Sequence, residues 1–328
     1  MSLNLTEQQK RLCNLLQQGL PICPRPFREI AKSLNINEAA VLREVERLRA
    51  LGVIRRLGAI INYRALGMIS TLVAAHIPEP NLQKVVEAIN ALDNVSHNYL
   101  RQHYYNLWFT LLADSAEQID IVLSELSARF NVDFHSLPAE RMFKLDARFD
   151  AEENERSFES VERLSTEEDV TLNEQQKMIL SKLQSELKPV AEPFGFLCSQ
   201  GQDRLSVEDV LGIITELIDK GLIRRIAAVL DHRKLGFVAN VLFAAEVSQQ
   251  RIIETGEALA HLPVVSHCCQ RKTFENWPYN LFAMMHGKSM ADIDRVISKF
   301  VEAEGIDSFQ LLPTAAELKK EPVKYHFF

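Results

Sequence analysis

The chain has 328 residues, of which 47% are hydrophobic and 25% charged, and its formal net charge is −7. These values are ordinary for a globular protein of two to four small domains. No run of 18 or more apolar residues is present, the N-terminus lacks the apolar core of a signal peptide, and the five cysteines have no regular spacing. The sequence therefore disfavours a membrane protein, a disulfide framework and a structural metal site, and it predicts a cytoplasmic location.

Several segments recur in the same order at offsets of 167 to 170 residues. The paired segments are LTEQQKRL (5–12) with LNEQQKMI (172–179), GVIRRLGAIINYRALG (52–67) with GLIRRIAAVLDHRKLG (221–236), VSHNYLR (95–101) with VSHCCQR (265–271) and, more loosely, LPAER (137–141) with LPTAAELKK (312–320). This repetition predicts two tandem copies of one unit.

The first sixty residues of each copy predict three helices and a strand. In copy one, FREIAKSLNINEAAVLREVERLRALG (27–52) has the apolar spacing of a helix–turn–helix. Asn37 is the expected N-cap of its second helix, and Gly52 is the expected stop. The strand GVIRRLGAIIN (52–62) then follows as a wing.

The remainder of each copy alternates between strands and helices. In copy one we expect strands at 70–78, 95–102, 105–114 and 132–144, and helices at 81–92 and 115–130. This order, βαββαβ, is that of a ferredoxin-like domain, and copy two follows the same order. The predicted fold class is α+β, with two tandem copies of a winged helix–turn–helix plus a ferredoxin-like domain.

The predicted domain boundaries follow from this reading. The helix–turn–helix domains are 1–65 and 171–235, the ferredoxin-like domains are 66–150 and 236–328, and the linker is 151–170. The linker AEENERSFESVERLSTEEDV has eight acidic and two basic residues, and it accounts for most of the negative charge.

The joined winged helix and ferredoxin-like domains resemble the Lrp/AsnC family of transcription regulators. The expected recognition helices, however, are rich in acidic residues. These are Glu38, Glu44 and Glu46 beside three arginines in copy one, and Glu208, Asp209, Glu216 and Asp219 beside Lys220 in copy two. Anionic helices are repelled by DNA phosphates, so DNA binding is disfavoured. A DNA-binding regulator that senses haem or an amino acid remains the alternative function.

The repeated histidine strand is the principal candidate site. Side chains alternate across a strand, so His97, Tyr99 and Arg101 are expected on one face together with Val95. The corresponding face of copy two has His267, Cys269 and Arg271, together with Val265. The four-residue step from histidine to arginine is roughly 13 Å, which suits a broad flat ligand.

The turn and the second strand of each hairpin supply further binding candidates. They are His103, Tyr105, Asn106 and Trp108 in copy one, and Trp277, Tyr279, Asn280 and His286 in copy two. Copy two has four additional residues at the turn, within KTFENWPYN, which predict a longer and more enclosing hairpin. Leu107, Phe109 and Met284 are expected in the core, and His76 and His135 are expected to be structural.

Together, GVIRRLGAI, VSHNYLRQHYYNLWFTL, LPAER and VSHCCQR…WPYNLFAMMHG closely resemble the siroheme decarboxylases. That family shares the Lrp/AsnC architecture; copy one is similar to its D-type subunit and copy two to its L-type subunit. The resemblance implies conversion of siroheme to 12,18-didecarboxysiroheme by loss of two acetate carboxyl groups, in haem d1 or alternative haem biosynthesis. The iron belongs to the siroheme substrate, so no separate cofactor is expected.

Siroheme carries eight carboxylates, so guanidinium groups are expected to bind it. The candidates are Arg101 and Arg271, with Arg55, Arg56, Arg224 and Arg225 in addition. An imidazolium at His97 or His267 suits proton delivery to the carbon that loses carbon dioxide. Which copy reacts stays open at this point, and His286 is an alternative acid or iron ligand.

The duplication also bears on assembly. Two fused copies predict an internal pseudo-dimer that replaces a dimer of separate chains, while a larger homo-oligomer and a complex with related decarboxylase subunits both stay open. A tetrapyrrole carrier without catalysis is the third candidate function.

Overall fold

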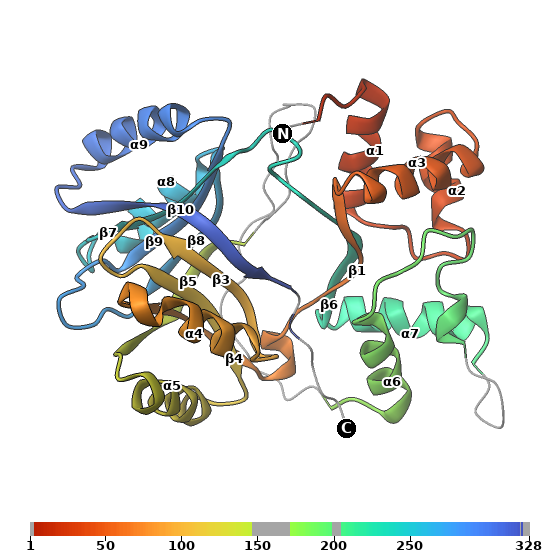
Figure 1. Cartoon of the computed structure of the whole chain (residues 1–328). Helices are drawn as coiled ribbons and strands as arrows, with labels where there is room; N and C mark the ends of the chain where they lie inside the picture. The colour runs from red at the N-terminus through yellow and green to blue at the C-terminus, as the bar shows by residue number, and fades with distance from the viewer. Residues whose placement is uncertain (1–2, 146–170, 199–204, 322, 324–328) are drawn as a thin grey trace.

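The computed structural model describes residues 3–145, 171–198, 205–321 and 323, and it divides into two units that lie side by side (Figure 1). One unit contains the helix–turn–helix elements of both copies. The other is a closed barrel of strands with helices on its outside. The predicted linker 151–170 lies outside the described residues. Within them, no helix has the length and apolar character needed to cross a membrane.

The helix–turn–helix of copy one forms as predicted. It consists of α1 (Glu7–Gln18), α2 (Pro26–Ser33) and α3 (Glu38–Ala50). The side chain of Asn37 accepts a hydrogen bond from the backbone amide of Ala40, as expected for the N-cap of α3. Gly52 follows α3 with a φ of 72°, a conformation that glycine adopts readily.

Copy two departs from this pattern. It has α6 (Glu174–Leu183) and α7 (Val207–Asp219), but between them the described residues contain only a short 3-10 helix, η2 (Gly195–Leu197). Pro189 and Pro193 lie in this segment, and proline lacks the amide that a helix interior requires. The expectation of three helices is therefore wrong for the described part of copy two.

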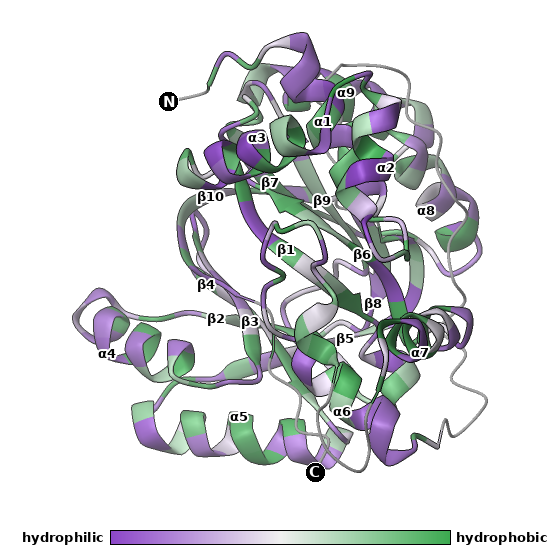
Figure 2. Ribbon diagram, turned by 90° about the vertical axis from the view of Figure 1, so that its right-hand side faces the viewer, coloured by the Kyte–Doolittle hydropathy of each residue, from purple (hydrophilic) through white to green (hydrophobic). Residues whose placement is uncertain are grey.

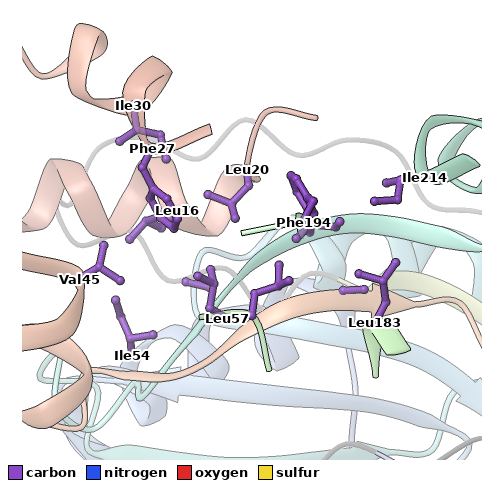
Figure 3. Packing of buried hydrophobic residues seen from close by; sticks show 14 of the residues in the cluster. Leu16, Leu20, Phe27, Ile30, Val45, Ile54, Leu57, Leu183, Phe194 and Ile214 are labelled. Atoms are coloured by element: carbon purple, nitrogen blue, oxygen red, sulfur yellow. The ribbon is translucent and has the colours of Figure 1, made fainter. Parts of the chain in front are cut away.

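The wing strands of the two copies pair with each other. β1 (Ile54–Ile61) and β6 (Ile223–Leu230) form a two-stranded antiparallel sheet. Their apolar side chains join one core that contains Leu16, Phe27 and Val45 from copy one and Leu183, Phe194 and Ile214 from copy two (Figure 3). The two helix–turn–helix regions consequently share a single hydrophobic core.

The ferredoxin-like order is confirmed in both copies. Copy one has β2 (Ile69–Ala75), α4 (Glu79–Asn90), β3 (Val95–Arg101), β4 (Leu107–Ala113), α5 (Ala116–Phe130) and β5 (Phe134–Leu145), preceded by the 3-10 helix η1 (Arg64–Leu66). Copy two has β7 (Ala239–Ala245), α8 (Ile252–His261), β8 (Val265–Arg271), β9 (Leu281–Gly287), α9 (Met290–Glu304) and β10 (Phe309–Lys320).

The last strand of each copy joins the two sheets. The first part of β5 pairs with β2 of its own copy, and its second part, which includes Met142, pairs with β8 of the other copy. β10 likewise pairs first with β7 and then with β3, where Glu317 lies opposite Tyr99. The result is a closed barrel in the order β10-β3-β4-β2-β5-β8-β9-β7.

Alternation along the strands separates two apolar layers. Outward residues such as Val73 and Phe109 pack against Val85 of α4 and Leu123 of α5. Inward residues form a second cluster, whose buried members are Ala74, Trp108, Leu137, Leu242, Ala244, Cys269, Trp277, Phe282 and Leu312. The outer helices show hydrophilic and hydrophobic residues in alternation, as expected for helices with one buried face (Figure 2).

The packing of β5 on α8 gives a stability prediction. A Cβ atom on Gly256 of α8 would lie 2.4 Å from the ring of Phe143 on β5. We expect Gly256→Ala to destabilise the protein by about 1–3 kcal/mol through overpacking, although alanine favours helix. Gly212→Ala in α7 is the matched control, because its Cβ would meet no atom within 4 Å. It should stabilise by about 0.5–1 kcal/mol in urea unfolding. Equal effects of the two substitutions would contradict the packing argument.

Candidate functional site

A β-bulge fixes which side chains of the histidine strands face the barrel interior. The pairing of β3 with β4 shifts between Val95 and His97, and Val95 packs in the outward layer beneath α4. His97 pairs with Thr110, and Tyr99 pairs with the inward-facing Trp108. The same shift occurs in β8, where Val265 joins the outward layer. The prediction that each valine shares the face of its histidine is therefore wrong, because a bulge resets the alternation.

The two histidines occupy equivalent positions. Nδ1 of His97 lies 2.8 Å from Oγ of Ser96, and Nδ1 of His267 lies 3.0 Å from Oγ of Ser266. Each is half-buried, on strands that stand across the barrel from each other. Their hydrogen bonds to the preceding serine hold both rings in a defined orientation.

The pKa of His97 lies well below its ordinary value. Burial, followed by the charges of Lys320, His267 and Arg55, lowers its pKa to about 3. The expected imidazolium is thus not the resting form of this side chain. Burial and the negative charge of Glu317 raise the pKa of the neighbouring Tyr99 to about 12, so its phenol keeps its proton.

The two predicted arginine clamps are anchored alike. Nη1 of Arg101 donates to the carbonyl oxygen of Leu312 at 2.8 Å, and Nη1 of Arg271 donates to that of Leu137 at 2.7 Å. In the part of the chain that the structure describes, neither guanidinium pairs with a carboxylate, and neither Nε has a hydrogen-bond partner. Arg101 is 4% exposed. A buried cation of this kind favours an anionic ligand, because an uncompensated buried charge is costly.

Arg55 and His286 join a polar cluster at the end of the barrel nearest β1. Nη1 of Arg55 lies 3.1 Å from Oε1 of Glu317, and its Nη2 donates to the carbonyl oxygen of Lys320 at 3.2 Å. Nζ of Lys320 lies 3.8 Å from Oε2 of Glu317 and 3.4 Å from Nδ1 of His232. The rings of His232 and His286 are 4.7 Å apart.

The sequence reasoning missed Lys320, Glu317 and His232. Lys320 is the last residue of β10 and lies opposite His97 in the pairing of β10 with β3. The loose match between LPAER and LPTAAELKK contained the signal. Continued to the end of both strands, it aligns Glu317 with Met142 and Lys320 with Leu145.

The other arginine candidates have contacts in the helix–turn–helix unit. Arg56 donates to the carbonyl oxygens of Ala59 and Gln184, and Arg225 lies beside Gly19 at the end of α1. Nη2 of Arg224 donates to Oδ1 of Asn62 at 3.3 Å. These contacts place the three side chains beside β1 and β6.

The aromatic candidates close the opposite end of the barrel. Trp277 is 2% exposed, and its ring lies 5.4 Å from that of Trp108 and 5.6 Å from that of Tyr105. Tyr279 and His103 contact the same indole at 4.8 Å and 5.4 Å between ring centroids. The longer hairpin of copy two thus encloses this end, as the additional residues predicted.

The two asparagine candidates have structural partners. The side-chain amide of Asn106 bonds to both the N–H and the C=O of Ile77, and that of Asn280 bonds in the same way to Val247. His76 bonds to the carbonyl oxygen of Tyr104, and His135 stacks on Phe274. Leu107 and Phe109 lie in the outward core, as expected, whereas Met284 lies in the inward layer and is half-buried.

Two family descriptions match the chain. "AsnC-like ligand binding domain" matches residues 65–144 and 234–319, which are the strands and helices of the barrel. "Siroheme decarboxylase NirDL-like HTH domain" matches residues 9–55.

Similar proteins cover nearly the whole chain. The siroheme decarboxylase of Hydrogenobacter thermophilus is 34% identical over 321 residues, covering 96% of this chain and 94% of the relative. The siroheme decarboxylase NirDL subunit of Paracoccus denitrificans is 30% identical over 304 residues, covering 92% and 91%. The siroheme decarboxylase alpha subunit of Desulfovibrio desulfuricans is 38% identical over 146 residues, 44% of this chain and 84% of that subunit.

Two solved structures have the same arrangement. The crystal structure of the siroheme decarboxylase NirDL has a TM-score of 0.73 and 31% identity, and covers 97% of this chain and 94% of its own. A second structure of that protein, in complex with an iron-uroporphyrin III analogue, has a TM-score of 0.72 at the same coverage.

The lowered pKa of His97 gives a prediction for stability against pH. The folded-state pKa of about 3 lies below the ordinary value of 6.5, so the unfolded chain binds more protons between these values. This contribution to stability is complete above about pH 6.5 and is lost as the pH falls toward 3. When the pH is lowered from about 6.5 to 5, the free energy of unfolding of the parent protein should fall by roughly 1–2 kcal/mol more than that of His97→Gln. Urea unfolding at the two pH values measures this difference. Identical losses in both proteins would show that His97 titrates normally.

Proposed function

Because the chain belongs to the siroheme decarboxylase family, we propose that it removes two acetate carboxyl groups from siroheme, giving 12,18-didecarboxysiroheme. We place this reaction in haem d1 formation, as the resemblance of the fused copies to D-type and L-type subunits implies. The observation that carries the proposal is the barrel interior, where two histidines and two arginines from different copies face the same space.

Binding of the substrate would rest on the buried guanidinium groups. Arg101 and Arg271 have free Nε donors and no carboxylate partner among the described residues, so each can bind a carboxylate of the macrocycle. Arg101 and Arg271 are the last residues of β3 and β8, so they lie next to the hairpin turns at the end of the barrel that Trp277 closes. The macrocycle would consequently enter from the end nearest β1, where His97 and His267 keep accessible surface.

The reaction breaks the bond between the acetate methylene and its carboxyl carbon. Carbon dioxide leaves, and the electron pair remains on the methylene carbon, where the conjugated macrocycle delocalises it. One proton then forms the new C–H bond of the methyl group, so each cycle consumes one proton. A bound carboxylate near His97 would offset the cations that lower its pKa, so the ring could take up a proton and deliver it.

The DNA-binding alternative has little support from the helix–turn–helix unit. On α3, Glu38 pairs with Arg25, and Arg49 pairs with both Glu46 and Glu186. The wing strands β1 and β6 bond to each other, so one edge of each wing is occupied by the partner strand. In the described part of copy two, the segment between α6 and α7 contains a 3-10 turn where copy one has a helix.

Anaerobic incubation with siroheme followed by mass spectrometry tests the proposal. We expect the successive loss of two carbon dioxide molecules from siroheme, with formation of the didecarboxylated product. Bound but unchanged siroheme would instead identify a carrier. Absence of siroheme binding together with tight, salt-sensitive duplex binding would identify a DNA-binding regulator.

The two histidines should differ in their contribution to the rate. Lys320 lies opposite His97, whereas Leu145 lies opposite His267. We expect His97→Ala to lower kcat by roughly 100-fold or more, the range for loss of a proton donor, and His267→Ala to have a smaller effect. Single-turnover measurements with siroheme separate this loss from weaker binding. Equal residual rates in the two variants would argue against one dominant proton donor.

A further inference from the structure

The two halves of the barrel interior differ at equivalent positions. We call β3 and the part of β10 that pairs with it the His97 half, and β8 with the pairing part of β5 the His267 half. Alignment of LPAERMFKL (137–145) with LPTAAELKK (312–320) matches Met142 with Glu317 and Leu145 with Lys320. In the ladders, Glu317 lies opposite Tyr99 and Met142 opposite Cys269. The His97 half thus has an ion pair where the His267 half has two apolar side chains.

The scaffold around these positions is the same in both halves. Lys144 donates to the carbonyl oxygen of Ala260 in α8, and the equivalent Lys319 donates to that of Asn90 in α4, at 2.9 Å and 2.8 Å. Both lysines bind the C-terminal end of a helix outside the barrel. The backbone register therefore matches in both halves, and Glu317 and Lys320 differ from their counterparts Met142 and Leu145 within this common scaffold.

Among the described residues, the charged groups around Lys320 leave an excess of positive charge. Arg55 and Lys320 both contact Glu317, so two cations share one carboxylate. Asp231 and Arg233 also act on Lys320, with opposite signs. His232 is in contact with Lys320 and is neutral, because burial lowers its pKa to about 4. An anion placed between His97 and Lys320 would complete this arrangement.

On the basis of the proposed function, we propose that Lys320 binds the reacting acetate carboxylate and that both decarboxylations take place in the His97 half, one after the other. Siroheme carries its two reacting acetates on different pyrrole rings, so one half-site can hold one of them at a time. After the first loss of carbon dioxide, the macrocycle turns or rebinds, and the second acetate occupies the same place beside His97.

Replacement of Lys320 by leucine tests this proposal. Leucine is the residue that the barrel already accommodates at the equivalent position 145, opposite a histidine, so the variant is expected to fold. We expect Lys320→Leu to slow both losses of carbon dioxide by about 10- to 100-fold, as for removal of a charged hydrogen-bond donor. Lys320→Arg, which keeps the charge, should restore most of both rates. Time-resolved mass spectrometry of siroheme and its two products gives the rates separately.

The possible outcomes distinguish this proposal from the function on which it rests. A Lys320→Leu protein that performs one loss at the parent rate and stalls at the second would show that each half serves one acetate. Parent rates for both losses, or failure of Lys320→Arg to recover activity in a protein with the parent unfolding midpoint, would also overturn the role of Lys320. If the parent protein itself leaves siroheme unchanged, the proposed function fails first.

Discussion

The final strands of the two copies exchange partners, and this exchange sets the geometry of the barrel. β5 and β10 each begin in the sheet of their own copy and end in the sheet of the other, and their backbone hydrogen bonds close the barrel. The carbonyl oxygens at the crossing points, on Leu137 and Leu312, also anchor Arg271 and Arg101. The link that joins the copies is therefore the same element that positions the charged groups of the interior.

Fusion of two copies in one chain allows the halves to diverge without loss of this scaffold. Lys144 and Lys319 retain the same role at the ends of α8 and α4, because both copies need it for packing. The inward positions are not bound by that requirement, since a leucine and a lysine both fit opposite a histidine. A symmetric dimer of identical chains would have to change both halves together.

Around His97, the electrostatics follow from burial and from the small number of carboxylates among the residues that the structure describes. The cations near His97 include Lys320 and Arg55, and Glu317 offsets part of their charge. A substrate with several carboxylates would supply the missing negative charge and would raise the pKa of His97. Substrate binding and preparation of the proton donor are then coupled by the same Coulomb interactions.

The duplication, the order of elements in each copy's barrel half and the histidine–arginine strands could be predicted from the sequence. Hydrophobic periodicity and helix capping depend on residues that are close together in the chain. The inward face of β3 was predicted correctly from His97 onward, but Val95 was assigned to the wrong face. The sequence pattern does not indicate a single-residue bulge, which changes the face of the residues before it. Three features could not be predicted from the sequence: the pairing of β1 with β6, the exchange of partners by β5 and β10, and the position of Lys320 opposite His97. These contacts join residues far apart in the chain, and their register depends on packing of the whole barrel.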